Sequence, residues 1–261
     1  MILTRKIPDT GLFKITMHDL ARRNALSEVM MDQLADALDE AATNPTIKVV
    51  IIAAEGPAFC AGHDLKEITA ARQSDDNGRA YFETLMKRCS DLMQSIVRHP
   101  HPVIAEINGV ATAAGCQLVA SCDLAYASDS SRFATPGVNI GLFCSTPMVA
   151  LSRNVSRKQA MEMLLSGEMI LASDAERIGL INRAMPEGEL SDTVMDMAAR
   201  IASKSGTTLK IGKRAFYEQA EMNLSDAYTY TSQVMVENML ERDAAEGIGA
   251  FLEKREPDWE S

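Results

Sequence analysis

Aromatic residues and paired cysteines are scarce in this sequence. Phe, Trp and Tyr make up 5% of the 261 residues, so the core has to be built from aliphatic side chains, alanine and 16 methionines. The cysteines number five, with no C-x-x-C pair, which argues against a disulfide framework or a zinc site. A reducing compartment is the default for such a chain, and we expect a cytoplasmic protein that holds no metal.

Positive charge is also in deficit. The chain has 26 Lys and Arg against 36 Asp and Glu, a net charge of −10, which disfavours nucleic acid and anionic membranes as partners and leaves room for a local basic pocket. The apolar runs fall well short of the ~18 residues of a membrane-spanning helix. The first residues, MILTRKIPDT, lack the apolar segment of a signal peptide. We therefore expect no membrane span.

Strand-like and helix-like segments alternate over the first 185 or so residues. Alternating polarity predicts a strand at 11–18, and continuous apolar runs predict buried parallel strands at 48–56 and 103–107. Helical spacing begins after Ser27, a plausible N-cap. The expected helices lie at 25–42, 79–97, 116–121, 157–166, 174–179, 189–203 and about 207–254, with a short strand at 123–127. We expect the last helix to break at Gly247 and Gly249. This order predicts an α/β fold with a helical C-terminal region.

Two segments share one design, VVIIAAEGPAFCAGHDLKEI at 49–68 and VIAEINGVATAAGCQLVA at 103–120. In each, a buried strand leads to a turn of small residues that opens a helix, where N–H groups lack an intrahelical acceptor. Two such starts facing one another would aim two N–H donors at one oxygen, which suits a carbonyl that gains negative charge during a reaction. Spacing alone favours a plainer interpretation, two ordinary strand–helix turns with glycine for tight packing.

Four segments resemble the crotonase (enoyl-CoA hydratase/isomerase) superfamily: AFCAGHDLKEI, INGVATAAGCQLVASCDLAYAS, RFATPGVNIGLFCSTP and EGIGAFLEKREPDW. They follow the family's order and spacing from about Leu12 to Trp259. The resemblance implies a ClpP-like spiral of ββα units over 1–200 and a helical region over 201–261 that mediates trimers or dimers of trimers. It also implies an acyl-CoA ligand, with coenzyme A entering as part of the substrate, no permanently bound cofactor, and a role in fatty acid metabolism.

The resemblance further implies that the thioester carbonyl accepts hydrogen bonds from the backbone N–H groups of His63 and Ala114. Alanines at positions 113 and 114 replace glycines that are common in the family. The family's hydratases carry two glutamates where this sequence has Gln117 and Gly137. Neither residue can transfer a proton, which argues against ordinary hydration and against isomerisation, since the isomerases keep the second acid. Gln117 is either an amide facing the acyl pocket or a buried amide bonded to backbone.

Coenzyme A contacts are implied for a larger set of residues. By the resemblance these are Arg22, Arg23, Ala25, Ala61, Asp64, Leu65, Lys66, Phe251 and Lys254. The lysines have a plainer interpretation as solvated surface residues, and Asp64 as a helix N-cap. Phe251 and Lys254 would reach the ligand from a neighbouring copy of the chain.

Three functions follow from these residues. The first is a CoA-thioester enzyme of the lyase or isomerase class, with its reaction unassigned. The second is decarboxylation of a malonyl-type thioester, which needs only enolate stabilisation; the third is a non-catalytic acyl-CoA-binding or assembly protein. Cys144 is expected to be a core thiol, because the sequence places no histidine beside it as a base. His99 and His101 are expected to point to opposite sides of a strand entry and to bind no metal.

Overall fold

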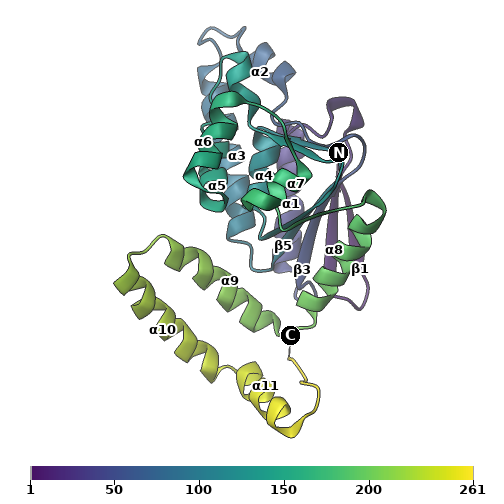
Figure 1. Ribbon diagram of the computed structural model, residues 1–261, viewed down its shortest axis with the longest axis vertical. Helices are drawn as coiled ribbons and strands as arrows, with labels where there is room; N and C mark the ends of the chain where they lie inside the picture. Colours follow the sequence, from purple (N-terminus) through teal and green to yellow (C-terminus); the bar gives the residue numbers. More distant parts are fainter. Residues whose placement is uncertain (1, 261) are drawn as a thin grey trace.

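The chain folds around a six-stranded sheet in the order β1-β2-β3-β5-β7-β10. The computed structural model describes residues 2–260, and Figure 1 shows the sheet with helices on both sides. All neighbouring strands are parallel except β1 and β2, which are antiparallel. The strands are β1 Ile2–Ile7, β2 Leu12–Met17, β3 Val49–Ala54, β5 Val103–Ile107, β7 Leu124–Ser128 and β10 Arg183–Met185. The predicted α/β alternation is confirmed.

A second, smaller sheet gives the fold its repeat. Its strands are β4 Ala58–Cys60, β6 Val110–Thr112, β8 Arg132–Ala134 and β9 Ile170–Leu171, in that order. The chain passes three times from a strand of the large sheet to a strand of the small one and then into a helix. Those helices are α2 Leu65–Ala71, α4 Ala114–Ser121 and the 3₁₀ helix η2 Pro136–Ile140. This is the expected winding of ββα units.

Helices cover both faces of the large sheet, which explains its apolar central strands. On one face lie α1 Glu28–Thr43, α3 Arg79–Val97 and α4, within the larger core cluster. On the other face α8 Glu187–Ala202 packs its own apolar stripe against the strands. Ser27 caps α1 as predicted, because its hydroxyl accepts a hydrogen bond from the N–H of Met30 at 3.2 Å. The outer helices are α5 Pro147–Asn154, α6 Arg157–Ser166 and α7 Ala172–Ile178.

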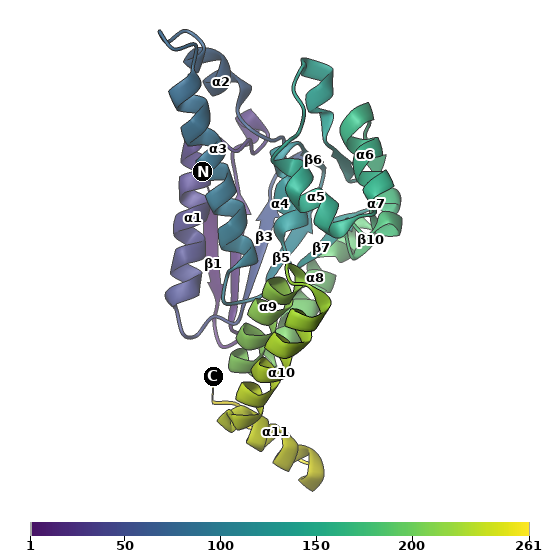
Figure 2. The same cartoon turned by 90° about the vertical axis from the view of Figure 1, so that its left-hand side faces the viewer.

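Three helices form the C-terminal region and project from the core (Figure 2). They are α9 Gly206–Ala220, α10 Leu224–Leu240 and α11 Arg242–Glu253. The predicted break at Gly247 and Gly249 is wrong, because both glycines lie inside α11. A Cβ at Gly247 would lie 3.0 Å from the indole of Trp259, so this glycine makes room for the returning chain end. The predicted division into units at residue 200 stays a prediction, and its outer ends, residues 1 and 261, lie outside the described residues.

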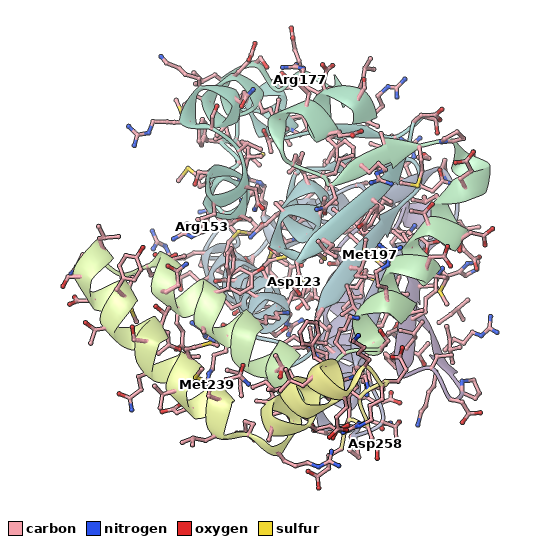
Figure 3. The ribbon with its side chains drawn as sticks, turned by 60° about the horizontal axis from the view of Figure 1, so that its bottom comes forward. Asp123, Arg153, Arg177, Met197, Met239 and Asp258 are labelled. Carbon is pink, nitrogen blue, oxygen red and sulfur yellow. The ribbon has the colours of Figure 1, made fainter. Side chains whose placement is uncertain are left out.

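One buried ion pair fastens α9 to the core. The ammonium of Lys213 donates to Asp123 at 2.6 Å and to the carbonyls of Ile96 and His101 at 3.0 and 3.1 Å. The hydroxyl of Tyr217 donates to the other carboxylate oxygen at 2.9 Å. Figure 3 places Asp123 where the sheet meets α9. Burial lowers the pKa of Lys213, and the Asp123 carboxylate opposes that shift.

Candidate active site

The first turn of the site joins β4 to α2 and is fixed by glycine and aspartate. Gly62 has φ +89, a conformation in which a side chain would be strained. The carboxylate of Asp64 accepts from the N–H of Lys66 at 2.8 Å, so the predicted N-cap is confirmed. The carbonyl of Gly62 accepts from the N–H of Leu26 at 2.8 Å. Because the peptide is trans, the N–H of His63 points the opposite way, away from Leu26.

The loop behind this turn depends on Asn24, which the sequence analysis missed. Asn24 is fully buried in the left-handed region, with φ +52. Its amide nitrogen donates to the carbonyls of Glu55 and Ala58 at 2.9 and 2.8 Å, and its oxygen accepts from the N–H of Asp19 at 2.7 Å. These bonds hold the loop in place so that its backbone can pair with the first turn. A polar residue inside RRNAL is the signal that could have found it.

The second turn joins β6 to α4 and is built differently. Ala113 stands before the helix with φ +51 and ψ −118, and its side chain makes no capping hydrogen bond. A side chain in this conformation is strained by about 1–3 kcal/mol. A Cβ at Gly115 would lie 2.1 Å from the carbonyl oxygen of Cys60, so only glycine lets α4 start this close to β4. The carbonyl of Ala113 accepts from the N–H of Gln117, so the N–H of Ala114 points outward from the helix start.

The two turns face each other. A Cβ built on Gly62 would lie 3.0 Å from the Cβ of Ala113 and 3.4 Å from the nitrogen of Ala114. Within residues 2–260, the N–H groups of His63 and Ala114 have no hydrogen-bond acceptor. Two N–H groups on adjacent turns are thus left without an acceptor in the described part of the chain.

The side chain of Gln117 on α4 is buried and has a thiol as its partner. Gln117 is 5% exposed, and its side-chain oxygen accepts from the Cys89 thiol at 3.9 Å. Its amide nitrogen makes no hydrogen bond with the described residues. Burial raises the pKa of Cys89 to about 11 and those of Cys60 and Cys116 to about 12, so these thiols stay protonated at neutral pH. Gln117 itself therefore offers a hydrogen-bond donor and no titratable group.

Gly137 leaves no empty space where an acid would have stood. A Cβ there would lie 2.8 Å from the carbonyl oxygen of Leu142 and 2.9 Å from the sulfur of Cys144. The N–H of Gly137 donates to that sulfur at 3.3 Å. Cys144 is buried, and burial raises its pKa above the ordinary thiol value. This arrangement agrees with the interpretation of Cys144 as a core thiol.

The imidazole of His63 is neutral in this fold. Its Nδ1 lies 3.4 Å from the carbonyl of Leu26, while Nε2 is buried without a partner. Burial lowers the pKa of His63, and the hydrogen bond to Leu26 only partly opposes that effect. The ring therefore packs into the turn, and the backbone N–H is the group of this residue that faces the site.

The coenzyme A candidates fall into two groups. Ala25 and Ala61 lie at the backbone pairing of the first turn, and Leu65 and Lys66 are exposed on α2. Arg22 lies 3.6 Å from Asp64 and 3.8 Å from Glu67, whereas Arg23 is exposed.

The second group, Phe251 and Lys254, lies at the end of α11. Figure 2 shows α11 and α2 at opposite ends of the molecule, so one chain does not bring the two groups together. Phe251 is 82% exposed.

The prediction for the two histidines at the entry to β5 is wrong. Their rings do not point to opposite sides: the centroids of His99 and His101 lie 5.4 Å apart, edge to face. His99 folds back because its Nδ1 accepts from the N–H of His101 at 3.1 Å, while its Nε2 lies 3.0 Å from the carbonyl of Leu38. Across residues 2–260, no group of three or more His, Cys, Asp or Glu side chains is placed to hold a metal ion.

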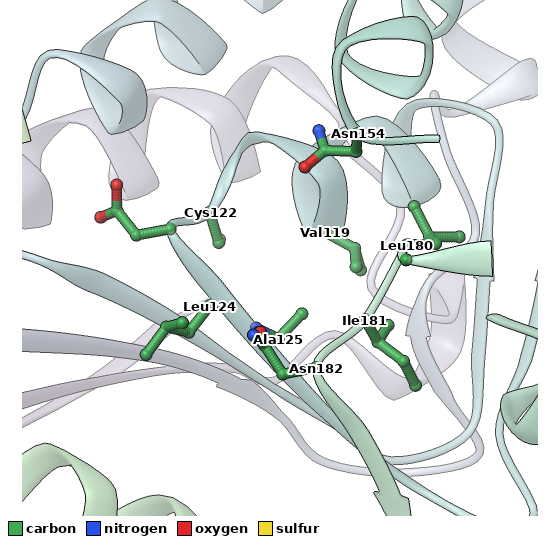
Figure 4. Close-up of a pocket in the computed structure, with 10 residues that line it drawn as sticks. Val119, Cys122, Leu124, Ala125, Asn154, Leu180, Ile181 and Asn182 are labelled. Atoms are coloured by element: carbon green, nitrogen blue, oxygen red, sulfur yellow. The ribbon is translucent and has the colours of Figure 1, made fainter. Parts of the chain in front are cut away.

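Two hollows lie away from the facing turns. One of about 190 Å³ is lined by Val119, Asn154, Asn182 and neighbours at the far end of α4 (Figure 4). The other, of about 360 Å³, lies between α9 and the core beside Lys213 and Tyr217. Neither is lined by His63, Ala114 or Gln117. No helix in the described part of the chain is both long and apolar enough to cross a bilayer.

Comparison with known proteins identifies the relatives of this chain. The sequence model of the family described as enoyl-CoA hydratase/isomerase matches residues 8–261. Human enoyl-CoA hydratase domain-containing protein 3, mitochondrial, is 52% identical over 250 residues, covering 95% of this chain and 80% of the human protein. An Escherichia coli protein named 2,3-dehydroadipyl-CoA hydratase is 31% identical over 94% of this chain and 93% of its own.

Solved structures share the fold. The crystal structure of the human domain-containing protein 3 superposes with a TM-score of 0.93 at 48% identity, covering 99% of both chains. An enoyl-CoA hydratase from Mycobacterium smegmatis superposes with a TM-score of 0.94 at 45% identity, covering 100% of this chain and 99% of its own. The resemblance inferred from motifs and the predicted crotonase spiral are confirmed.

The predicted cytoplasmic location is wrong by the same comparison. The rat, human and mouse relatives, 49–52% identical, are all named as mitochondrial proteins, which points to mitochondria instead. The prediction failed because cysteine usage reports a reducing environment and does not distinguish one reducing compartment from another.

Proposed function

Since this chain belongs to the enoyl-CoA hydratase/isomerase family, we propose that it is a CoA-thioester enzyme that holds the thioester carbonyl between the N–H groups of His63 and Ala114. The observation that carries the proposal is the pair of facing turns whose N–H groups have no acceptor within residues 2–260. Each donor strengthens its hydrogen bond as the carbonyl oxygen becomes an enolate oxygen. The names of the relatives suggest acyl-CoA substrates for this chain as well.

Hydration of an enoyl thioester is not the reaction this site favours. Hydration needs a group that takes a proton from water and a group that gives one to the α carbon, and each such group contributes about 10²–10⁴-fold. Gln117 has no titratable group, the neighbouring thiols are held protonated, and the side of Gly137 is filled by Cys144. A reaction that draws its electrons from the substrate itself fits these residues better.

Decarboxylation of a malonyl-type thioester meets that condition. The bond between the α carbon and the carboxylate breaks, CO₂ leaves, and the electron pair becomes the enolate held by the two N–H groups. The α carbon of the enolate then takes a proton from a water molecule, which leaves as hydroxide and is neutralised by the solvent. The specific support is the amide nitrogen of Gln117, which has no partner among the described residues and whose oxygen is already occupied by Cys89. It is a neutral donor suited to the substrate carboxylate.

The first test follows the enoyl absorbance of crotonyl-CoA with the native protein and with Gln117→Glu, an isosteric exchange of amide for acid. We expect no measurable decrease in absorbance with the native protein. The variant should hydrate crotonyl-CoA at a rate at least about 10²-fold above the detection limit set by the native protein. Gln117→Met is the matched control without either group. Hydration by the native protein at an ordinary enzyme rate would contradict the argument. Gly137→Glu is avoided, because its Cβ would strike Leu142 and Cys144.

The second test measures CO₂ release from methylmalonyl-CoA and ethylmalonyl-CoA. Release by the native protein and its loss in Gln117→Met support the decarboxylase. Saturable binding of these thioesters without any product supports the remaining candidate, a non-catalytic acyl-CoA binder.

We further propose that copies of the chain assemble through the C-terminal helices into trimers or dimers of trimers. Large apolar side chains are exposed on α10 and α11, with Leu240 at 82% and Leu252 at 73%. Phe251 and Lys254 would then reach the coenzyme A of a neighbouring copy. Leu240→Glu should shift the mass measured by light scattering toward the single chain, while Val29→Glu on α1 should not. An unchanged mass in Leu240→Glu would place the interface elsewhere.

A further inference from the structure

The side chain of Thr112 links the two turns of the site. Thr112 ends β6, and its hydroxyl donates to the carbonyl of Ala61 at 3.1 Å across 51 residues of sequence. Ala61 belongs to the first turn, and Thr112 stands two residues before Ala114 in the second. The bond is partly buried, with Thr112 9% exposed. It therefore joins the backbone that carries one donor to the backbone that carries the other.

Two other backbone groups of the first turn bond to the loop behind it. The N–H of Ala61 donates to the carbonyl of Arg23, and the carbonyl of Gly62 accepts from the N–H of Leu26. Both bonds tie the turn to the loop behind it. The Thr112 hydroxyl satisfies the remaining carbonyl, that of Ala61, and pulls in the opposite direction. The peptide that presents the N–H of His63 is thus held through its Gly62 carbonyl by Leu26, and the peptide just before it is held through its Ala61 carbonyl by Thr112.

The contact between the turns is as close as the backbone permits. A Cβ on Gly62 would lie 3.1 Å from the carbonyl oxygen of Thr112, beside its contact with Ala113. Ala113 meanwhile keeps a conformation that alanine avoids, with φ +51. A strained turn relaxes when it is free to move. The hydrogen bond of Thr112 anchors the residue before Ala113 and so keeps the N–H of Ala114 in its orientation.

We propose that Thr112 is a positioning residue, whose hydroxyl sets the separation at which the His63 and Ala114 N–H groups converge on one oxygen. The inference rests on the proposed function, because it concerns the same thioester carbonyl. The backbone N–H groups polarise the carbonyl, and the Thr112 side chain contributes by holding them in position. Without the hydroxyl, the two donors no longer meet the oxygen together.

The test reads the carbonyl directly, by isotope-edited infrared spectroscopy of bound crotonyl-CoA labelled with ¹³C at the thioester carbon. The native protein is expected to lower the C=O stretching frequency relative to free crotonyl-CoA. In Thr112→Val, which keeps the shape and removes the hydroxyl, the frequency should return at least halfway to the free value. Thr112→Ser, which restores the hydroxyl, should recover the native frequency. Affinity for coenzyme A itself, which lacks the carbonyl, should stay within about twofold in all three proteins.

Thr43→Val is the matched control, because the hydroxyl of Thr43 also donates to a backbone carbonyl, that of Asp39 on α1, at 2.9 Å. It should leave the frequency at the native value. A native frequency in Thr112→Val overturns the positioning role and leaves the proposed function standing. Equal losses of crotonyl-CoA and coenzyme A affinity in Thr112→Val overturn it too, since they reveal general destabilisation. A native protein that binds crotonyl-CoA with no frequency shift overturns the proposed oxyanion site itself, and the inference with it.

Discussion

The two turns of the site reach the same result by different means. In the first, Gly62 adopts a positive φ without cost, and the carboxylate of Asp64 caps the helix that follows. In the second, Ala113 holds a positive φ against its own preference, and no side chain caps α4. Contact with β4 at Gly115 replaces the missing cap. An unpaired N–H can therefore be presented either by local chain chemistry or by tertiary packing that overrides it.

The packing of the second turn is broken most severely by Gly115→Ala. The new methyl group would meet the carbonyl of Cys60, so α4 must move away from β4. Overpacking of this kind costs about 3 kcal/mol of unfolding free energy, measured by urea denaturation. Gly212→Ala on α9 is the control, because nothing lies within 4 Å of its new Cβ, and it should stabilise by about 1 kcal/mol. Equal stability of the two variants would mean that the second turn does not depend on packing.

The local cap of the first turn is removed by Asp64→Ala. The variant loses the hydrogen bond to the N–H of Lys66 and the pairing with Arg22, which we expect to cost about 1–2 kcal/mol in the same assay. Asp64→Asn keeps a capping oxygen without the charge and should lose less than about 0.5 kcal/mol. If Asn destabilises as much as Ala, the carboxylate acts through Arg22 and not as a cap.

Strain in the second turn is relieved by Ala113→Gly. Glycine adopts φ +51 freely, so the strain is relieved. This gain in unfolding free energy exceeds the cost from the larger conformational entropy of glycine in the unfolded chain by about 1 kcal/mol. The melting temperature should rise by about 2–4 °C in calorimetry. Gly62→Ala makes the opposite exchange in the first turn and should lower the melting temperature. A lower melting temperature in Ala113→Gly would show that the methyl contact with the first turn outweighs the strain.

The smallest expected effect concerns pH, because only the first turn carries a titratable ring. Burial lowers the pKa of His63, so the unfolded chain, with its histidine pKa near about 6.5, binds the proton more readily. The contribution of His63 is then fully present above pH 6.5 and is lost as the pH falls from there toward its folded pKa. His63→Asn should narrow the difference in unfolding free energy between pH 7.5 and 5.5, whereas Ala113→Gly should not change it. An unchanged difference in His63→Asn would mean that the ring is already solvated.

The sequence predicted the large sheet better than the small one. Continuous β-branched runs identified β3 and β5, because strands buried on both faces need them. The strands β4, β6 and β8 have three residues each, too few for any period to appear, and they were missed. A glycine within a helical pattern predicts a break, but Gly247 makes room for the indole of Trp259, a contact that no local pattern reveals.

The side-chain contacts of the candidate site could not be predicted from the sequence. The spacing of small residues alone favours ordinary strand–helix turns, so the two N–H donors rest on the family resemblance and stay a prediction. No pattern placed the Thr112 hydroxyl on Ala61, or the Cys144 sulfur in the space beside Gly137, because each pairs residues from different elements. Arg22 was expected to be available to coenzyme A, yet Asp64 and Glu67 lie beside it.

The ion pair between Lys213 on α9 and Asp123 in the core has a consequence for the order of events during synthesis. The groups that receive Lys213 and Tyr217 precede them by 90 to 117 positions, so the receiving groove leaves the ribosome complete before α9 exists. N-terminal parts of a chain fold first, and Asp123 must stay hydrated until its ammonium partner arrives. Docking of α9 is then the step that brings an ammonium to Asp123. A chain whose synthesis stops before residue 206 keeps a lone carboxylate where the finished protein has an ion pair.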